Sequence, residues 1–159
     1  MTKMGRILAI ALLTATVATP VAGESPLEGR WLLVAESYGS GQSNRAPLTQ
    51  PFRLEFFREG PRLAGRVWFG DAKAQAVPWP SLGLVPLDAD EVVVGPGEDR
   101  VSVRYRARHA GDETVLEITE EYRVTSGGAT LSGTVTVALL RGTEPAGSYV
   151  LERRFRREP

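Results

Sequence analysis

The sequence predicts an all-β domain, a single antiparallel up-and-down barrel of about eight strands. Three observations lead to this fold class. Apolar residues after position 24 recur at every second position and almost never with helical spacing. The chain has 159 residues, a length that suits one domain with one core. It also contains 17 glycines and 11 prolines, an excess that is typical of a chain with many turns.

Residues 1–23 have the three-part pattern of a secretory signal peptide. Lys3 and Arg6 precede an apolar run over 7–17, and small residues continue to Gly23. The apolar run is shorter than the ~20 residues that a membrane-spanning helix needs, so we expect no transmembrane span. We expect cleavage after Gly23, export to the periplasm or out of the cell, and a barrel domain over 24–159. The alternative is an N-terminal core helix.

Composition excludes several classes of function. The 19 basic and 19 acidic side chains balance, so no charge excess favours nucleic acid as a partner. The absence of cysteine excludes disulfides, a cysteine zinc site and a thiol nucleophile. The single histidine, His109, falls in an expected turn, which excludes a histidine-rich metal site. We therefore expect no metal and no cofactor, and we identify no catalytic residues; whether the protein is an enzyme stays open.

The alternation gives the strands in order. The expected ranges are 29–37, 51–58, 62–70, 90–95, 101–108, 114–125, 129–140 and 147–156, with 84–87 as a possible ninth. The clearest is 101–108, where Tyr105 lies on the apolar face and Arg106 on the polar one. If this strand pairs with the next through a hairpin at 109–113, Arg106 faces Glu117 across the outer surface.

Connection lengths predict that the barrel has one open and one closed end. Short turns are expected at Glu59–Gly60, 96–100 and 126–128. The long connections are 38–50, 71–89, 109–113 and 141–146. In an up-and-down barrel, alternate connections lie at the same end. All four long connections are therefore expected at one end of the barrel and the short turns at the other. This is how a barrel that admits a ligand would be built.

The first and last strands carry a resemblance to a known family. The domain opens with Gly29-Arg30-Trp31, and its last expected strand is rich in arginine, including Arg153. This combination resembles the lipocalins and their wider lipocalin-like (calycin) relatives, small antiparallel barrels that commonly bind one hydrophobic ligand. The resemblance implies that Trp31 closes the barrel floor beside Gly29 and that Arg153 packs across it. The Thr-Asp-Tyr motif of classical lipocalins is absent, so the resemblance is to the broader group.

The expected register places two charged residues inside the barrel. Pairing the inward faces of the last three strands puts Tyr122 opposite Gly133, Glu120 opposite Val135, and Val135 opposite Arg153. A lone buried charge costs several kcal/mol, whereas a paired and hydrogen-bonded charge is tolerated. We therefore expect a cluster of Glu120, Arg153 and Trp31 in the floor. The alternative is a bulge that turns Glu120 outward.

The apolar interior suggests a ligand. An eight-stranded barrel is just wide enough either to be filled by its own side chains or to hold one small molecule. The first possibility is a solid core, and the second is a cup for an apolar or amphipathic molecule. The candidate ligand-binding residues are Leu33, Phe52, Phe69, Trp79, Tyr105, Ile118, Leu139 and Tyr149.

Two alternatives to ligand binding remain. A solid barrel would act as an accessory module that binds a protein partner, and the outward aromatics Phe57 and Trp68 would mark the surface. An enzyme of the isomerase or cyclase type would use Glu120 as a base and Arg153 as an electrostatic stabiliser. The ligand's identity and the oligomeric state are left open by the sequence.

Overall fold

The structure is a computed structural model that describes residues 25–39, 51–70 and 75–159. The expected signal peptide at 1–23 lies outside the described residues, as do residues 40–50 and 71–74 of the two longest expected connections. The account below therefore concerns the barrel domain.

The described chain forms one antiparallel sheet of ten strands. Their order in the sheet is β4-β3-β2-β1-β10-β9-β8-β7-β5, with β6 also paired to β7, so most neighbours in sequence are neighbours in space. This confirms the all-β, up-and-down antiparallel fold. The strands are β1 (Gly29–Tyr38), β2 (Phe52–Glu59), β3 (Arg62–Phe69), β4 (Val77–Trp79), β5 (Val85–Pro86), β6 (Glu91–Val94), β7 (Arg100–Arg108), β8 (Val115–Thr125), β9 (Thr130–Arg141) and β10 (Glu144–Arg157).

Two short strands raise the number from about eight to ten. The possible ninth strand at 84–87 is present as β5, and β4 was not expected because a proline interrupts its three residues. These strands change the pairing at the sheet edges. β3 pairs with β4, whereas β5 and β6 both pair with β7. In the described chain no backbone ladder joins β4 to β5 or β6, so the sheet is a curled half-barrel.

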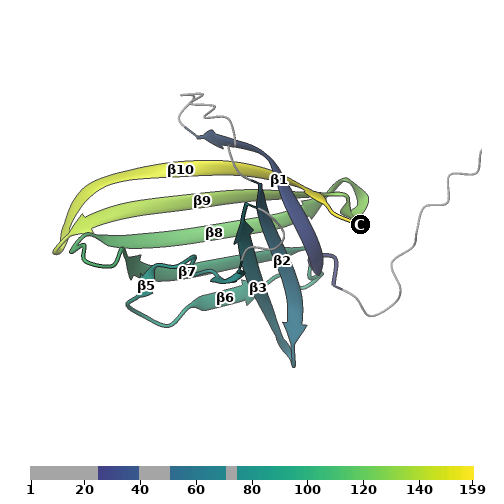
Figure 1. Cartoon of the computed structure of the whole chain (residues 1–159), viewed down its shortest axis with the longest axis horizontal. Helices are drawn as coiled ribbons and strands as arrows, with labels where there is room; N and C mark the ends of the chain where they lie inside the picture. The colour runs from purple at the N-terminus through teal and green to yellow at the C-terminus, as the bar shows by residue number, and fades with distance from the viewer. Residues whose placement is uncertain (1–24, 40–50, 71–74) are drawn as a thin grey trace, which may run out of the picture.

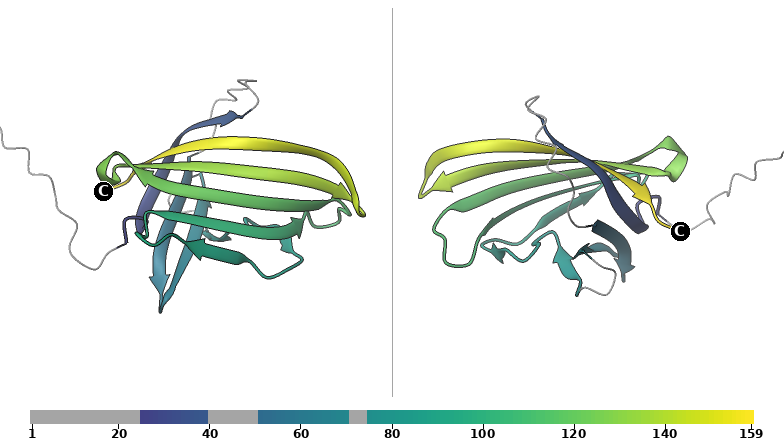
Figure 2. Two further views of the ribbon diagram at one scale, coloured as in Figure 1. Left: turned by 180° about the vertical axis from the view of Figure 1, so that it is seen from behind. Right: turned by 45° about the horizontal axis from the view of Figure 1, so that its top comes forward.

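Figures 1 and 2 show how the sheet curls. Strands β7–β10 are long and run side by side, and β1–β3 cross them at a steep angle near the end where the C-terminus lies. β1 joins the two parts because it pairs with β2 on one side and with β10 on the other. The crossing strands cover one end of the concave face of β7–β10 and leave the other end to shorter segments.

The turns differ from expectation at one place. The tight turns after Glu59 and over 126–128 are confirmed, and Gly60 adopts the left-handed φ of +61° that such a turn requires. The expected loop at 141–146, however, is wrong. β9 and β10 continue to a turn at 142–143, and an irregularity between Pro145 and Gly147 shifts their register. One of the four expected long connections is therefore short.

The core follows the predicted alternation. Arg106 pairs with Glu117, and Tyr122 pairs with Gly133, as expected from the sequence. Beneath the crossing strands, aromatic rings pack in a connected series with centroids 5.1 to 6.2 Å apart. This part of the interior is filled by side chains. The series consists of Phe69, Phe52, Phe155, Tyr122, Phe56 and Trp79.

The described residues contain no helix long and apolar enough to cross a membrane. They also contain no cluster of three or more acidic or histidine side chains placed to hold a metal ion.

Gly133 gives a test of the packing beneath the crossing strands. A Cβ atom at this position would lie 2.5 Å from Cε1 of the buried Tyr122 ring, so the ring would have to shift and disturb its packing against Phe56 and Phe155. We expect Gly133→Ala to lower the free energy of unfolding by about 1–3 kcal/mol, measured by urea denaturation. Ser132→Ala, at the exposed neighbouring position of β9, is the matched control. Equal stability of the two variants would contradict the packing described here.

Candidate functional site

The site is built around Glu120, a carboxylate on β8 with only 1% of its surface exposed. The β8–β9 register places Glu120 opposite Val135, as expected, and the alternative of an outward bulge is wrong. Oε2 accepts hydrogen bonds from the Tyr122 hydroxyl at 2.7 Å and from Nε1 of Trp79 at 3.0 Å. Oε1 accepts one from the Tyr105 hydroxyl at 2.8 Å. Three strands, β4, β7 and β8, therefore supply donors to one buried carboxylate.

The two tyrosines remain protonated donors. Burial, followed by the negative charge of Glu120, raises the pKa of Tyr105 far above its ordinary value. The same two causes raise the pKa of Tyr122. A tryptophan N–H can only donate, and both tyrosine hydroxyls are protonated, so the Glu120 oxygens are the acceptors in all three hydrogen bonds. Hydrogen bonds from neutral groups thus compensate much of the cost of burying Glu120.

Arg153 lies in the same interior but has a different partner from the one expected. Because β9 and β10 join through a tight turn at 142–143, and not through the expected loop at 141–146, Arg153 lies opposite Gly133 instead of Val135, even with the irregularity between Pro145 and Gly147. Its Nε donates to Oε2 of Glu36 at 2.6 Å, and its guanidinium lies 5.2 Å from the ring centroid of Phe52. Burial disfavours the charge of Arg153, but Tyr122 and Glu36 outweigh that effect and raise its pKa. The expected contact with Trp31 is not formed.

Glu36 reaches the interior because β1 contains a bulge. The β1–β10 register runs from Leu33 opposite Phe155 to Ala35 opposite Arg154, so one residue of β1 is extra. Side chains alternate along a strand, and an extra residue reverses which of them point inward. Simple alternation from Leu33 would point Glu36 outward. The bulge instead places it directly opposite Arg153.

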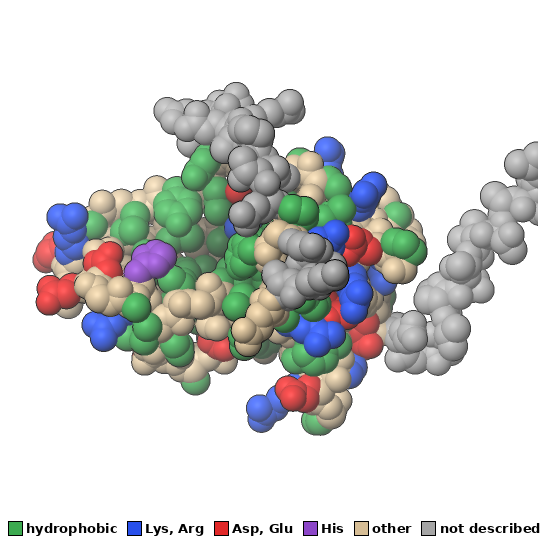
Figure 3. Space-filling model, in the orientation of Figure 1, with side chains coloured by type: hydrophobic (Ala, Val, Ile, Leu, Met, Phe, Trp, Pro, Cys, Tyr) green, Lys and Arg blue, Asp and Glu red, His purple; other side chains and the backbone are tan. Residues whose placement is uncertain are grey.

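A cavity of about 160 Å³ opens beside these charged groups. It lies at the end of the concave face that β1–β3 leave uncovered, and Figure 3 shows hydrophobic side chains gathered there around His109. Its walls are mainly aliphatic and aromatic, with Glu120 and Arg153 as the charged exceptions. The lining residues are Leu82, Leu84, Tyr105, His109, Leu116, Ile118, Glu120, Val135, Val137, Tyr149, Leu151 and Arg153.

The structure divides the predicted ligand-binding residues into two groups. Tyr105, Ile118 and Tyr149 line the cavity. Three of the others are buried in the packed part, where Trp79 contacts Glu120 and Leu33 and Phe52 belong to the core. The remaining two are less buried: Phe69 is 49% exposed, and Leu139 is partly buried and packs against the core. Three of the eight predicted ligand-binding residues therefore line the cavity.

Sequence reasoning missed part of the lining. Leu82 and Leu84 come from the segment between β4 and β5, which offers no strand periodicity to place them. His109 was expected only as a turn residue. Alternation also gives Leu116, Val137 and Leu151 inward positions, but alternation alone does not distinguish a packed position from one that borders a cavity.

The barrel floor holds Trp31, but with Arg157 as its partner. Trp31 is fully buried, and its Nε1 donates to the carbonyl oxygen of Leu27 at 2.9 Å. The β1–β10 register pairs Trp31 with Arg157, whose guanidinium lies 4.3 Å from the indole centroid. Arg157 also donates to the carbonyl oxygens of Glu28 and Gly128 at 2.6 and 2.8 Å. The role implied for Arg153 by the resemblance thus falls on a residue four positions further along β10.

Gly29 stands beside this floor. Its φ is +124°, a conformation that L side chains rarely adopt, and a Cβ atom there would lie 2.8 Å from Nη1 of Arg157. Glycine at this position therefore leaves room for the arginine that covers Trp31.

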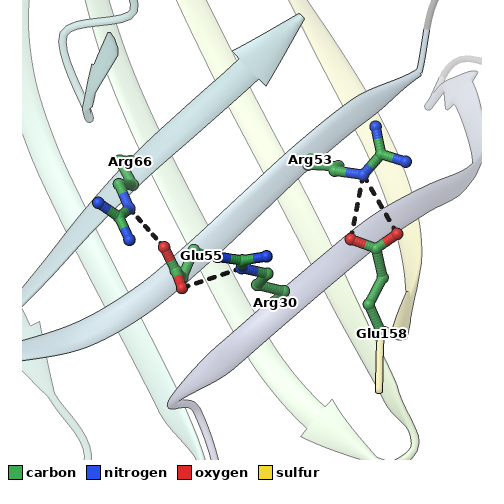
Figure 4. Close-up of polar contacts among 5 residues, drawn as sticks. All are labelled: Arg30, Arg53, Glu55, Arg66 and Glu158. Atoms are coloured by element: carbon green, nitrogen blue, oxygen red, sulfur yellow. Dashed lines mark hydrogen bonds and ion pairs between the residues drawn. The ribbon is translucent and has the colours of Figure 1, made fainter. Parts of the chain in front are cut away.

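The outward aromatics Phe57 and Trp68 form part of an arginine-rich face on β1–β3. The Arg66 guanidinium lies 5.1 Å from the centroid of each ring. Figure 4 shows Glu55 between Arg66 and Arg30, with a separate pair between Arg53 and Glu158. Burial opposes the ionisation of Glu55, but hydrogen bonds from the two arginines prevail and lower its pKa.

A larger depression of about 510 Å³ lies along β6–β9, and part of its wall consists of outward side chains such as Ser102, Glu121 and Thr134. In the described chain, the buried residues whose side chains carry a charge or a hydroxyl group are Ser25, Tyr105, Glu120 and Tyr122. Of these, only Tyr122 borders the depression, and its hydroxyl is directed to Glu120. The smaller cavity with Glu120 is therefore the better candidate site.

Comparisons with known proteins give little beyond the structure itself. No protein-family model and no curated protein matches the chain. Among solved structures, zebrafish ileal bile acid-binding protein in complex with cholic acid is similar, with 12% sequence identity and a TM-score of 0.42. The match covers 84% of this chain and 100% of that one.

Arg157 tests the composition of the floor. Replacement by alanine removes the cation from Trp31 and leaves backbone carbonyls of the opening segment without this donor. We expect Arg157→Ala to lower the free energy of unfolding by about 1–2 kcal/mol, measured by chemical denaturation. Arg156→Ala, which removes the exposed neighbouring arginine, should change stability by less than about 0.5 kcal/mol. A larger loss in the control than in Arg157→Ala would argue against this floor.

Proposed function

We propose that the protein binds a small apolar or amphipathic molecule in the cavity beside Glu120. The observation that carries this proposal is that one part of the interior is filled by side chains and the other contains a cavity. Aromatic rings fill the part beneath β1–β3, yet apolar side chains farther along β7–β10 border an opening next to two charged groups. Apolar walls with a few convergent polar groups are the usual composition of a small-molecule site.

The size of the cavity limits what enters it. Drug-sized ligands occupy sites of roughly 300–1,000 Å³, whereas an engineered apolar cavity of about 150 Å³ holds a molecule as small as benzene. The cavity here, at about 160 Å³, therefore fits one ring or a short alkyl chain. A longer molecule would leave its remainder at the mouth, near the half-exposed Tyr149.

Ile118 provides the test of binding. Its side chain is buried in β8 and lines the cavity, so Ile118→Trp should fill the space. We expect the natural protein to bind small apolar fluorophores saturably and Ile118→Trp to bind them at least tenfold more weakly, measured by fluorescence titration. Thr119→Trp, at the neighbouring outward position, is the control for the added indole.

A failure of this test would favour a different function. If the natural protein binds neither apolar dyes nor lipids, the cavity is not a binding site. The second candidate is then an accessory module that contacts a protein partner through the face containing Phe57, Arg66 and Trp68. This candidate has support from the aromatic and arginine side chains on one outward surface.

We also propose that the protein is exported and cleaved after Gly23. Support comes from the three-part pattern of residues 1–23, and a cut after Gly23 keeps the buried Ser25 and Leu27 in the mature chain. Expression with the full leader in a bacterial host should yield a mature chain that starts at Glu24, identified by intact mass spectrometry of the periplasmic fraction and the medium. Recovery of the exported protein with Met1 retained would contradict cleavage.

A further inference from the structure

We infer that the cavity selects a ligand with a positively charged end, such as the ammonium group of an amphipathic amine. This inference rests on the proposed function, because it specifies the ligand class of the same cavity. It is based on the charges around the cavity, on the acceptor that Glu120 still offers, and on the aromatic rings nearby.

The balance of charges inside the domain favours a cation. The described part of the chain places two carboxylates, Glu36 and Glu120, and one guanidinium, Arg153, in or directly beside the cavity wall. Arg153 is ion-paired with Glu36 at 2.6 Å. The contacts recorded for Glu120 all come from neutral donors, and no ion pair joins it to a described cation. Glu120 is therefore the carboxylate whose charge has no cationic partner.

Glu120 also retains the capacity to accept another hydrogen bond. Two carboxylate oxygens offer about four acceptor positions, and three are occupied. Oε2 receives Trp79 and Tyr122, whereas Oε1 receives only Tyr105. A free acceptor position thus remains on Oε1, the oxygen that is contacted by Tyr105 of the cavity wall. A charged N–H donor forms a stronger hydrogen bond with a carboxylate than a neutral O–H does.

The same geometry disfavours an anion. Arg153 is the cation that an acidic ligand would require, and Glu36 already accepts from its Nε. A carboxylate entering the cavity would have to share Arg153 with Glu36 and would also lie near Glu120. Tyr105 and Tyr149 add aromatic surface to the cavity wall, and aromatic rings attract cations and not anions. The size and hydrophobicity of the cavity alone would not distinguish a cationic ligand from an anionic one of the same length.

Three ligands of equal chain length test this inference. Octylamine, octanol and octanoate each contain eight carbons in an unbranched chain and, at pH 8, carry a positive, zero and negative charge. Binding is measured by isothermal calorimetry, with Trp fluorescence as a second signal because Trp79 contacts Glu120 directly. We expect octylamine to bind about tenfold more tightly than octanol and octanoate to bind most weakly.

Variants then assign the preference to Glu120. Glu120→Gln keeps the size of the side chain and removes its charge, so the amine should lose its advantage over the alcohol. Glu121→Gln removes the exposed carboxylate one residue away and should leave the order of affinities unchanged. Because Glu120→Gln can also destabilise the core, Glu36→Gln is a second variant at a partly exposed position. It frees Arg153 and should raise the affinity for octanoate relative to octylamine.

The outcomes separate this inference from the proposed function. Octanoate binding as tightly as octylamine to the natural protein, at a site that Ile118→Trp blocks, would overturn the cation preference and leave ligand binding in place. An amine preference unchanged in Glu120→Gln would also overturn it. Failure of all three ligands to bind would contradict the proposed function itself.

Discussion

The interior depends on the hydrogen bonds that Glu120 receives from Trp79, Tyr105 and Tyr122. Trp79 belongs to β4 at one end of the strand order, and Tyr105 to β7 near the other. No backbone ladder connects these ends in the described chain. One carboxylate therefore bridges, through side chains, two edges that backbone hydrogen bonds would join in a closed barrel. Its burial is tolerated because each contact is made by a donor that needs a partner itself.

This bridge also determines where the interior is full and where it is open. Trp79, held by Glu120, packs edge-on against Phe56 and near Tyr122, and these rings occupy the space beneath β1–β3. Beyond Glu120 the crossing strands end, and the cavity begins with Tyr105 and Ile118 in its wall. The solid core and the ligand cup, which composition presents as alternatives, thus occupy adjacent parts of one interior. Glu120 lies at the boundary between them.

Much of this arrangement follows from alternation, and its errors arise where alternation is interrupted. The sequence correctly places Glu120 and Tyr122 on the inward face, because β8 and β9 pair without irregularity. It misplaces Arg153, because the turn between β9 and β10 is shorter than the expected loop at 141–146 and changes the register of the two strands. It also assigns to Arg153 the contact with Trp31 that Arg157 makes. Alternation does not predict the position of Trp79 either, because β4 is too short and contains a proline.

The bulge in β1 shows how the charge of such an interior can change without any substitution in the cavity wall. One extra residue near Val34 turns Glu36 inward, opposite Arg153. Regular pairing of the same residues would place Ala35 opposite Arg153 and Glu36 opposite Glu152, and would direct the Glu36 carboxylate to solvent. Loss of the bulge, in a strand remote from Glu120, would then leave one carboxylate and one guanidinium at the cavity in place of two carboxylates and one guanidinium. Among homologues, the presence of this bulge in β1 is therefore as informative about ligand charge as the identity of the lining residues.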